Sequence, residues 1–311
     1  MSYNLTVQQE LGHNFVMDMA YVGNQGRQIP AGYNLNADRS APGAGAPGQP
    51  LYGITGGVNN SIHRVADTNL LGIGTNSNYN SLQVRVIRRS THGLTNTTSY
   101  TWGKAMGNVS SDKALGYYNY YIESQRNYSR VDWDQTHMFR ESLLYALPFG
   151  RAGKFLQHGI AGQVFGGWEV GTVIGLDSGL PMTFTSSGTG YNSPGNTVVA
   201  DQIKPFVKLK KIGSGNYWFD PTAFVASPAN RNGNTGQNMY SGPAQFSFDA
   251  TLTRSFAFTE RYTLRMRLNA FQVTNTPQFS NPTTSLTSSD FGSITKAGGN
   301  RQLQLAATLN F

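Results

Sequence analysis

The sequence predicts an all-β fold: an antiparallel transmembrane β-barrel portion of about nine long strands, with short periplasmic turns and long extracellular loops. Three observations predict it. Apolar and polar residues alternate with a period of two along nine segments. The links between these segments alternate between short and long, which is typical of transmembrane barrels. Charged residues are only 13% of the chain, about half the share of a typical soluble domain.

The alternation is clearest in the second half of the chain. Residues 245–256 place Phe246 and Phe248 on one side of the strand and Ser247 and Asp249 on the other. The segment 164–186 contains "DSGLP", which we interpret as a bulge within one long strand. In chain order, the nine predicted strands are 2–9, 13–23, 77–90, 93–104, 136–149, 164–186, 245–256, 261–273 and 301–311.

The links fix the direction of each strand. The long links are 24–76, 105–135, 187–244 and 274–300, and they are rich in Gly, Pro, Asn and Ser. The last strand must run toward the periplasmic side, and counting back through nine strands makes the first run the same way. Complete bacterial single-chain barrels have an even strand number. We therefore expect residues 1–311 to be the C-terminal part of a barrel domain whose N-terminal strands are absent, and "MSYNLTVQQE" has no signal-peptide pattern.

Composition removes several other classes of protein. No window of about 18 residues is continuously apolar, so no transmembrane helix is expected. The chain has no cysteine, and therefore no thiolate nucleophile or Cys metal site. The net charge is +8, but the basic residues are scattered, with the densest groups at 85–89 and 208–211. A nucleic-acid partner is not expected, because it would need basic residues clustered on one face.

Catalytic and metal-binding patterns are not found. The histidines at 13, 63, 92, 137 and 158 lack metal-ligand spacing. Asp132 and Asp134 flank Trp133; a calcium role is one interpretation, and a solvated approach to the next strand is the preferred one. The "GKAMG" stretch lacks the spacing of a phosphate-binding loop, and no serine lies in a nucleophile elbow. We predict no enzyme activity, no catalytic residue, no cofactor and no metal.

Several stretches resemble one family. They are "YNLTVQQELGHNFVMDMAYVGNQGRQIP" (3–30), "ALPFGRAGKF" (146–155), "FGGWEVGTVIGLDSGLPMTF" (165–184), "RMRLNAFQVTNTPQFSNP" (265–282) and "DFGSITKAGGNRQLQLAATLNF" (290–311). Together, in this order, they resemble the C-terminal barrel part of Oar-like TonB-dependent receptors, whose N-terminal domain is carboxypeptidase-regulatory-like. The stretch 269–272 departs from the family, which usually has an acidic residue and Phe-Asn before this loop.

The resemblance implies a location and a mechanism. It implies an outer-membrane receptor of a Gram-negative cell that takes up an unidentified solute past a plug, energised by the TonB complex. The plug would belong to the missing N-terminal part, which would also contact TonB. The implied partners are outer-membrane lipid and lipopolysaccharide, the barrel-assembly machinery, and a small solute, oligosaccharide or peptide.

The resemblance also assigns a role to the last strand. Barrels of the family end on Phe, which the barrel-assembly machinery recognises. It implies that Leu303, Leu305, Leu309 and Phe311 carry this signal. The alternation agrees, because these residues fall on one face of the strand.

Further candidate residues come from the polar face and the loops. Arg265 and Arg267 are candidates to face the lumen, opposite an anionic plug or solute; lumen solvation and cross-strand pairing are the preferred alternative. Tyr217, Trp218 and Tyr240 are loop aromatics that could stack on a solute. Anchoring at the membrane interface or packing within the loops is equally compatible with the sequence.

A second class of protein stays open. A surface-exposed or secreted β-sandwich for adhesion or carbohydrate binding would also show alternating strands. The two hypotheses differ in the surroundings of Phe246, Phe248, Leu264 and Met266. A sandwich buries them against a second sheet, whereas a barrel presents them as a belt toward lipid.

Overall fold

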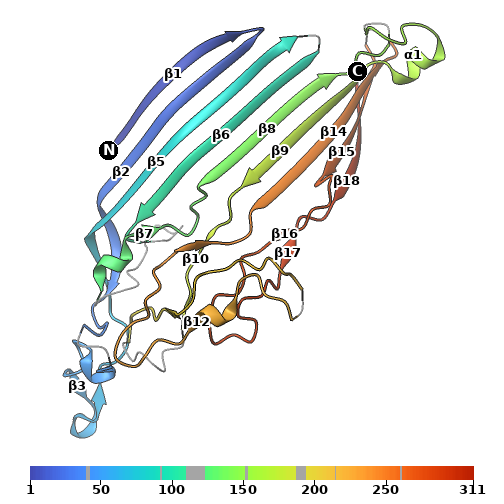
Figure 1. The fold of residues 1–311 in the computed structure, drawn as a ribbon. Helices are drawn as coiled ribbons and strands as arrows, with labels where there is room; N and C mark the ends of the chain where they lie inside the picture. Colours follow the sequence, from blue (N-terminus) through green and yellow to red (C-terminus); the bar gives the residue numbers. More distant parts are fainter. Residues whose placement is uncertain are drawn as a thin grey trace.

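Nine long antiparallel strands form one large, open sheet in the computed structural model (Figure 1). The structure describes residues 1–39, 43–91, 93–109, 123–150, 153–186, 194–213, 215–259 and 261–311. The strand order follows the chain, and each strand pairs with its neighbour in sequence along the path. The nine strands are β1 (Ser2–Gly12), β2 (Phe15–Asn34), β5 (Asn69–Thr91), β6 (Leu94–Gly107), β8 (His137–Ala146), β9 (Trp168–Asp177), β14 (Gln245–Ala257), β15 (Thr263–Phe271) and β18 (Gln302–Asn310).

This sheet confirms the nine predicted strands and their connectivity, and some strands differ from the prediction in length. β2 and β5 run beyond the predicted 13–23 and 77–90, and they stay paired as far as Asn34 and Asn69. Two register shifts, around Ile29, accompany the extension. Gly26 and Pro30 lower the strand propensity of this stretch, and the bulges let the pairing continue past them.

The prediction of one strand over 164–186 is wrong. β9 ends at Asp177, and Pro181–Met182 form a separate strand, β10, that pairs with β13 (Tyr240–Ser241). Gly179 lies where the backbone before β10 passes close to the backbone after β13: a Cβ there would meet the carbonyl oxygen of Gly242 at 2.1 Å. "DSGLP" is therefore the exit from the sheet, and not a bulge within it.

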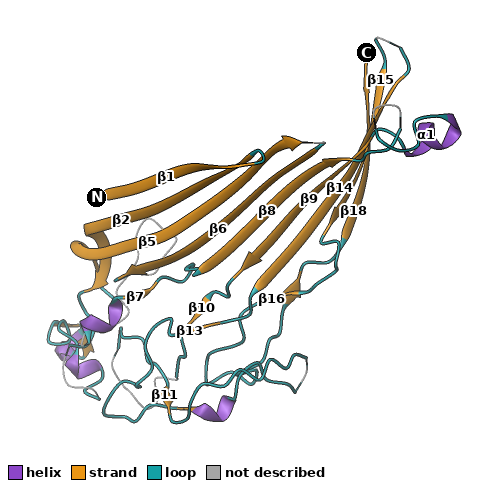
Figure 2. Cartoon of the chain, turned by 45° about the horizontal axis from the view of Figure 1, so that its top comes forward, coloured by secondary structure: helices purple, strands orange, loops and turns teal. Residues whose placement is uncertain are grey.

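The links are sorted by length between the two ends of the sheet (Figures 1 and 2). The described residues of the links 13–14, 92–93, 147–167 and 258–262 lie at one end, together with the C-terminus. Those of the long links lie at the other end. His92 of the second link lies outside the described residues. The third link holds a helix, α1 (Gly159–Phe165), which the alternation did not predict. Among the described residues, no helix has the length and apolar character needed to cross a membrane.

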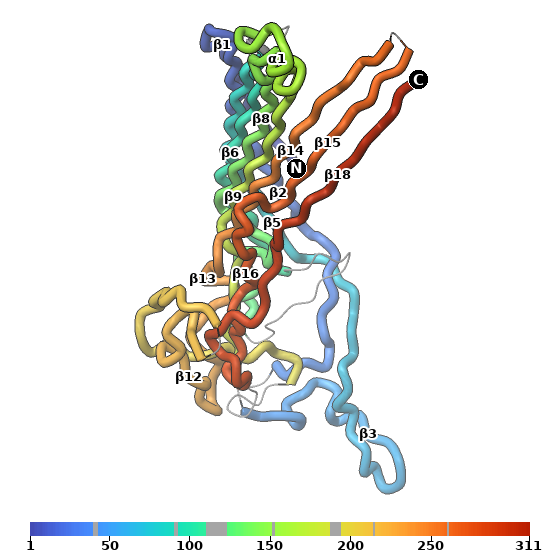
Figure 3. Tube along the Cα trace, turned by 90° about the vertical axis from the view of Figure 1, so that its right-hand side faces the viewer, coloured from blue at the N-terminus to red at the C-terminus, as the bar shows by residue number. Residues whose placement is uncertain are grey.

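The long links carry short elements of their own. The small strands are β3 (Thr55–Gly56), β4 (Ile62–His63), β7 (Ser129–Arg130), β10, β11 (Asp201–Gln202), β12 (Phe224–Val225), β13, β16 (Gln278–Phe279) and β17 (Ala297–Gly298). The 3₁₀ helices are η1 (Ala46–Gly48), η2 (Val58–Asn60), η3 (Ser124–Asn127) and η4 (Pro221–Ala223). Figure 3 shows the β3 hairpin standing apart from the links 178–244 and 272–301, which lie together.

The register separates the large sheet into an apolar and a polar face. Leu252 lies opposite Val170 on β9 and Leu268 on β15, and Leu268 lies opposite Leu305 on β18. The residues at the alternate positions point to the opposite face, where polar side chains lie side by side, such as Asp18 opposite Arg85. Each face therefore runs across all nine strands, because the side-chain period along every strand is two.

The buried apolar core lies in the long links and not on the sheet. Every buried apolar side chain of the described ranges lies in these links, except Ala31, which is in the extension of β2. Phe246, Phe248, Leu264 and Met266 share the apolar face and are only partly buried. The other sheets in the described part of the chain have two strands each, so none covers this face as a sandwich requires.

Candidate functional site

The polar face of the sheet carries ion pairs between neighbouring strands. The Arg85 guanidinium donates to Asp18 Oδ2 at 2.6 and 2.9 Å, and the Gln8 amide donates to the other oxygen at 2.7 Å. Arg140 binds Asp177 through two bonds of 2.7 Å. Each pair joins side chains of two neighbouring strands, so the pairs hold these strands in register on the polar face.

Arg265 and Arg267 lie on this polar face, as the alternation predicts. Their neighbours on β18 are Thr308 and Ala306. Both arginines are exposed, and neither forms a salt bridge within the described residues. Their role toward a plug or a solute stays a prediction.

An aromatic cluster holds the long links together. Phe184 is fully buried; its ring stacks on Phe224 at 4.0 Å and meets Phe219 edge-on at 5.1 Å. We call this cluster the loop core; its buried members are Met182, Phe184, Ala200, Trp218, Phe219, Ala223, Phe224, Phe291 and Ile294. Residues from two separate links build it, so the two links form one packed unit.

The three predicted loop aromatics occupy different positions relative to the loop core. Trp218 belongs to the core and is 8% exposed. Tyr240 packs against it, stacking on Phe206 at 4.1 Å, while its hydroxyl donates to Gln202 Oε1 at 2.7 Å. Tyr217 is 40% exposed. The packing alternative accounts for the surroundings of Trp218 and Tyr240, and Tyr217 has the exposed ring that contact with a solute requires; whether it makes such a contact stays a prediction.

A charged pair, Asp201 and Arg231, stabilises one side of the loop core. Arg231 binds Asp201 through two bonds of 2.6 and 2.7 Å, and the Asn234 backbone N–H donates to the same carboxylate at 2.8 Å. These donors favour the ionised carboxylate, with Arg231 contributing most, so they lower the pKa of Asp201 below its ordinary value. Arg126 connects a second link by donating to the carbonyls of Gly233 and Thr235.

Asp132 and Asp134 bind groups of the protein. Asp134 is buried; it accepts the Ala105 backbone N–H at 2.6 Å and pairs with Arg130 at 2.9 Å. Asp132 accepts from the Asn238 amide at 2.8 Å. Asp134 is thus buried and paired, which differs from the solvated approach that we preferred. No group of three or more metal-ligating side chains occurs in the part of the chain that the structure describes.

The residues of the predicted assembly signal lie together on the apolar face of β18. Leu303, Leu305 and Leu309 pair with Ala270, Leu268 and Leu264 of β15, and all three are exposed. Phe311 follows the strand and is 91% exposed. This placement agrees with the alternation, and recognition by the assembly machinery stays a prediction.

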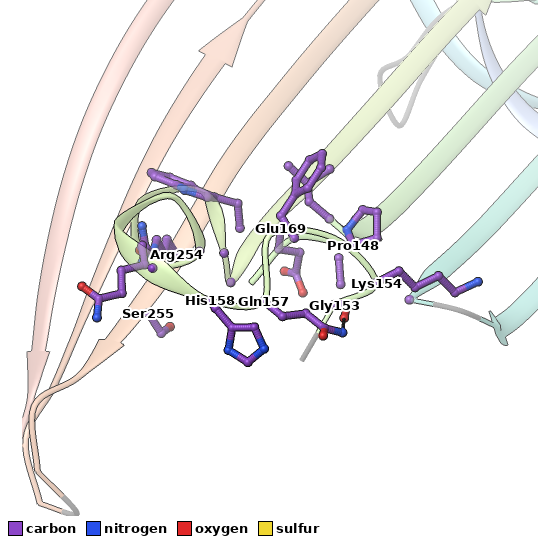
Figure 4. Close-up of a pocket in the computed structure, with 18 residues that line it drawn as sticks. Pro148, Gly153, Lys154, Gln157, His158, Glu169, Arg254 and Ser255 are labelled. Carbon is purple, nitrogen blue, oxygen red and sulfur yellow. Dashed lines mark hydrogen bonds between the residues drawn. The ribbon is translucent and has the colours of Figure 1, made fainter. Parts of the chain in front are cut away.

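A cavity of about 860 Å³ lies at the short-link end of the sheet, beside α1 (Figure 4). Its lining includes Lys154, His158, Glu169 and Arg254. Arg254 comes from β14, whereas the other three belong to β8–β9 and their link, so the cavity brings together segments distant in sequence. The alternation does not predict this cavity. Arg254, the single arginine of β14 and on its apolar face, is the one sign of it in the sequence.

An open antiparallel sheet with one apolar, unburied face defines a transmembrane β-barrel portion. The chain belongs to the outer membrane beta barrel domain family, whose model matches residues 1–304. It is a protein of the Gram-negative outer membrane. A search of curated proteins finds no match.

A solved outer-membrane transporter shares the fold. The outer membrane transporter YddB from Escherichia coli superposes with a TM-score of 0.54 at 8% identity, covering 100% of this chain and 32% of that chain. The pyoverdine receptor FpvA from Pseudomonas aeruginosa PAO1 gives a TM-score of 0.47 at 10% identity, covering 100% and 29%. The chain thus spans about a third of the length of YddB. The resemblance to a receptor barrel is confirmed at the level of the fold, and the Oar-like assignment within it stays a prediction.

Proposed function

We propose that this chain is the C-terminal barrel part of a TonB-dependent receptor that takes up a solute across the outer membrane with energy from the TonB complex. The observation that carries the proposal is the sheet itself. Its exposed apolar face fits lipid, its opposite face holds the ion pairs Asp18–Arg85 and Arg140–Asp177, and its long links pack into a folded unit at one end. A polar wall and an ordered external cap are what a solute pathway requires.

The partners of the complete protein follow from this proposal. The plug and the TonB contact belong to the missing N-terminal part. The apolar face contacts lipid and the loop end contacts lipopolysaccharide, while Leu303, Leu305, Leu309 and Phe311 are offered to the barrel-assembly machinery. The solute, an oligosaccharide, a peptide or another small molecule, enters past the links that carry the exposed Tyr217.

Growth on defined sources tests energised uptake. Cells lacking the gene are compared with cells carrying the complete gene, each with and without TonB. Each culture receives a peptide digest, a maltooligosaccharide mixture or ferric citrate as its limiting source. We expect the gene to restore growth on one of these sources in cells that contain TonB, and not in cells that lack it.

Equal rescue with and without TonB would contradict the proposal, because the barrel would then act as a passive pore. No rescue on any of the sources, with the protein folded in the membrane, would exclude energised uptake of these solute classes.

A further inference from the structure

The short link between β8 and β9 presents an apolar surface away from the sheet. Phe155 and Leu156 precede α1, and Ile160, Val164 and Phe165 lie within it; all five are exposed, Ile160 by 81%. We call residues 155–165 the turn helix segment. Neither the proposed uptake function nor the ion pairs of the polar face make use of it.

The helix separates apolar from small and polar positions. At about 100° per residue, Ile160, Val164 and Phe165 fall within one arc, and Gly162 and Gln163 fall outside it. The Gly162 side packs against its own link, since a Cβ there would meet the Leu156 carbonyl oxygen at 2.3 Å. The apolar arc therefore points away from the protein.

The contacts of α1 place it on the apolar side of the barrel wall. Arg254 and Trp168 are register partners on the face that carries Leu252 and Val170. The Trp168 indole N–H donates to the Val164 carbonyl at 3.0 Å, and the Arg254 guanidinium donates to the carbonyls of Val164 and Gln163. The side chains of Trp168 and Arg254 lie on the lipid-facing side of their strands. The helix that they bind therefore lies outside the barrel wall and not in the lumen.

The charges beside the turn helix segment suit phospholipid headgroups. The Arg254 guanidinium lies over the Phe256 ring at 4.2 Å, and Lys154 is exposed at the rim of the adjoining cavity. Phe258 and Tyr262 are exposed at the same end of the sheet. Cationic side chains next to aromatic and aliphatic ones are typical of segments that lie in a membrane interface.

We propose that the turn helix segment is a lateral membrane anchor that inserts Ile160, Val164 and Phe165 among the phospholipids of the periplasmic leaflet, beside the barrel wall. Its surface continues the apolar face of the sheet, which is the reason for choosing phospholipid over a protein partner. The anchor needs the barrel to span the membrane, but it does not depend on the solute or on TonB.

Spin labels test this placement directly. The chain contains no cysteine, so Ile160→Cys and Gln163→Cys each introduce a single site into it. The complete receptor, with any cysteine elsewhere replaced, is reconstituted in vesicles of phosphatidylethanolamine and phosphatidylglycerol. Collision of the label with oxygen, which concentrates in lipid, is compared with collision with a water-soluble nickel chelate. Heat-modifiable migration in electrophoresis shows that each variant is folded.

We expect the label at position 160 to collide several-fold more with oxygen than with nickel, and the label at 163 to show a clearly lower ratio. Preferred collision with nickel at 160 would place the segment in water and overturn the proposal. Exclusion of both reagents at 160 would indicate a protein contact and would also overturn it. Should Ile160→Cys fail to fold, Val164→Cys probes the same arc.

Discussion

At the scale of single residues, polar side chains decide how the long links meet. Arg126 donates to two carbonyls in the segment 233–235, Arg231 binds Asp201, and the Asn238 amide donates to the Arg130 carbonyl. These bonds join residues 30 to 109 positions apart. Because they satisfy buried or half-buried groups, losing one leaves its partner without a bond, which costs more than the bond contributes.

The Asp201–Arg231 pair allows a prediction about substitution. Asp201→Asn removes the charge that Arg231 binds, and we expect a loss of about 1 kcal/mol in the local opening free energy, since Arg231 is half exposed. That corresponds to about fivefold faster hydrogen exchange in peptides covering 199–203 and 231–235. Asp290→Asn, at an exposed carboxylate outside any described salt bridge, is the matched control. Equal exchange in both variants would show that Asp201 does not stabilise the links.

The same pair predicts a dependence on pH. The folded protein holds the pKa of Asp201 below its unfolded value of about 3.9, so the stabilisation is complete above that pH and is lost as the pH falls through the folded pKa. Exchange of these peptides, corrected for its intrinsic pH dependence, should accelerate below about pH 4. Asp201→Asn should flatten this acceleration, and an unchanged pH profile in the variant would contradict the assignment.

At the scale of elements, the sequence predicts the long strands, which follow from periodicity. It does not predict α1 or the loop core, which depend on contacts between residues distant in the chain. All nine long strands follow from alternation, because one face meets an apolar medium along the whole strand. α1 has two glycines in seven residues, and its last carbonyls accept from Arg254, about 90 positions away, so no local pattern indicates it. The loop core is similar, because its aromatics come from irregular links without a period.

The two faces of β18 predict different costs for neighbouring substitutions. Leu305→Arg places a charge on the apolar face near the middle of the strand and should cost about 2–4 kcal/mol. Gln304→Arg is the matched control on the polar face and should cost less than about 1 kcal/mol. Urea unfolding of the complete protein in vesicles measures both. A similar cost at both positions would mean that β18 does not face lipid.

The loop core predicts a difference between two adjacent aromatics. Trp218→Ala empties a buried site and should cost the loop unit about 3–5 kcal/mol, whereas Tyr217→Ala should cost less than about 1 kcal/mol. Limited proteolysis of the complete protein in vesicles reports this as much faster cleavage of the links 178–244 in the first variant. If Trp218→Ala left cleavage unchanged, the packing role of Trp218 would be wrong and contact with a solute would be favoured.

At the scale of the whole molecule, the sheet is open and its two edge strands point the same way. β1 and β18 both run toward the short-link end, because every pairing between neighbouring strands along the sheet path is antiparallel and there are nine strands. Joining the edges would create one parallel pair in an otherwise antiparallel barrel. An open edge in lipid leaves backbone N–H and C=O groups unpaired, at several kcal/mol for each group.

This geometry predicts that residues 1–311 alone do not form a monomeric barrel in lipid. With Thr6→Cys and Thr308→Cys on the two edge strands, we expect no disulfide within one chain when the isolated segment is reconstituted, and we expect aggregation or pairing between copies instead. In the larger barrel that we propose, the same cysteines should stay apart, because that barrel would have additional strands between β1 and β18. Thr6→Cys alone controls for links between copies. A monomeric, protease-resistant segment with an internal Thr6–Thr308 disulfide would show that nine strands close on themselves, and the assignment of this chain as part of a larger barrel would fall.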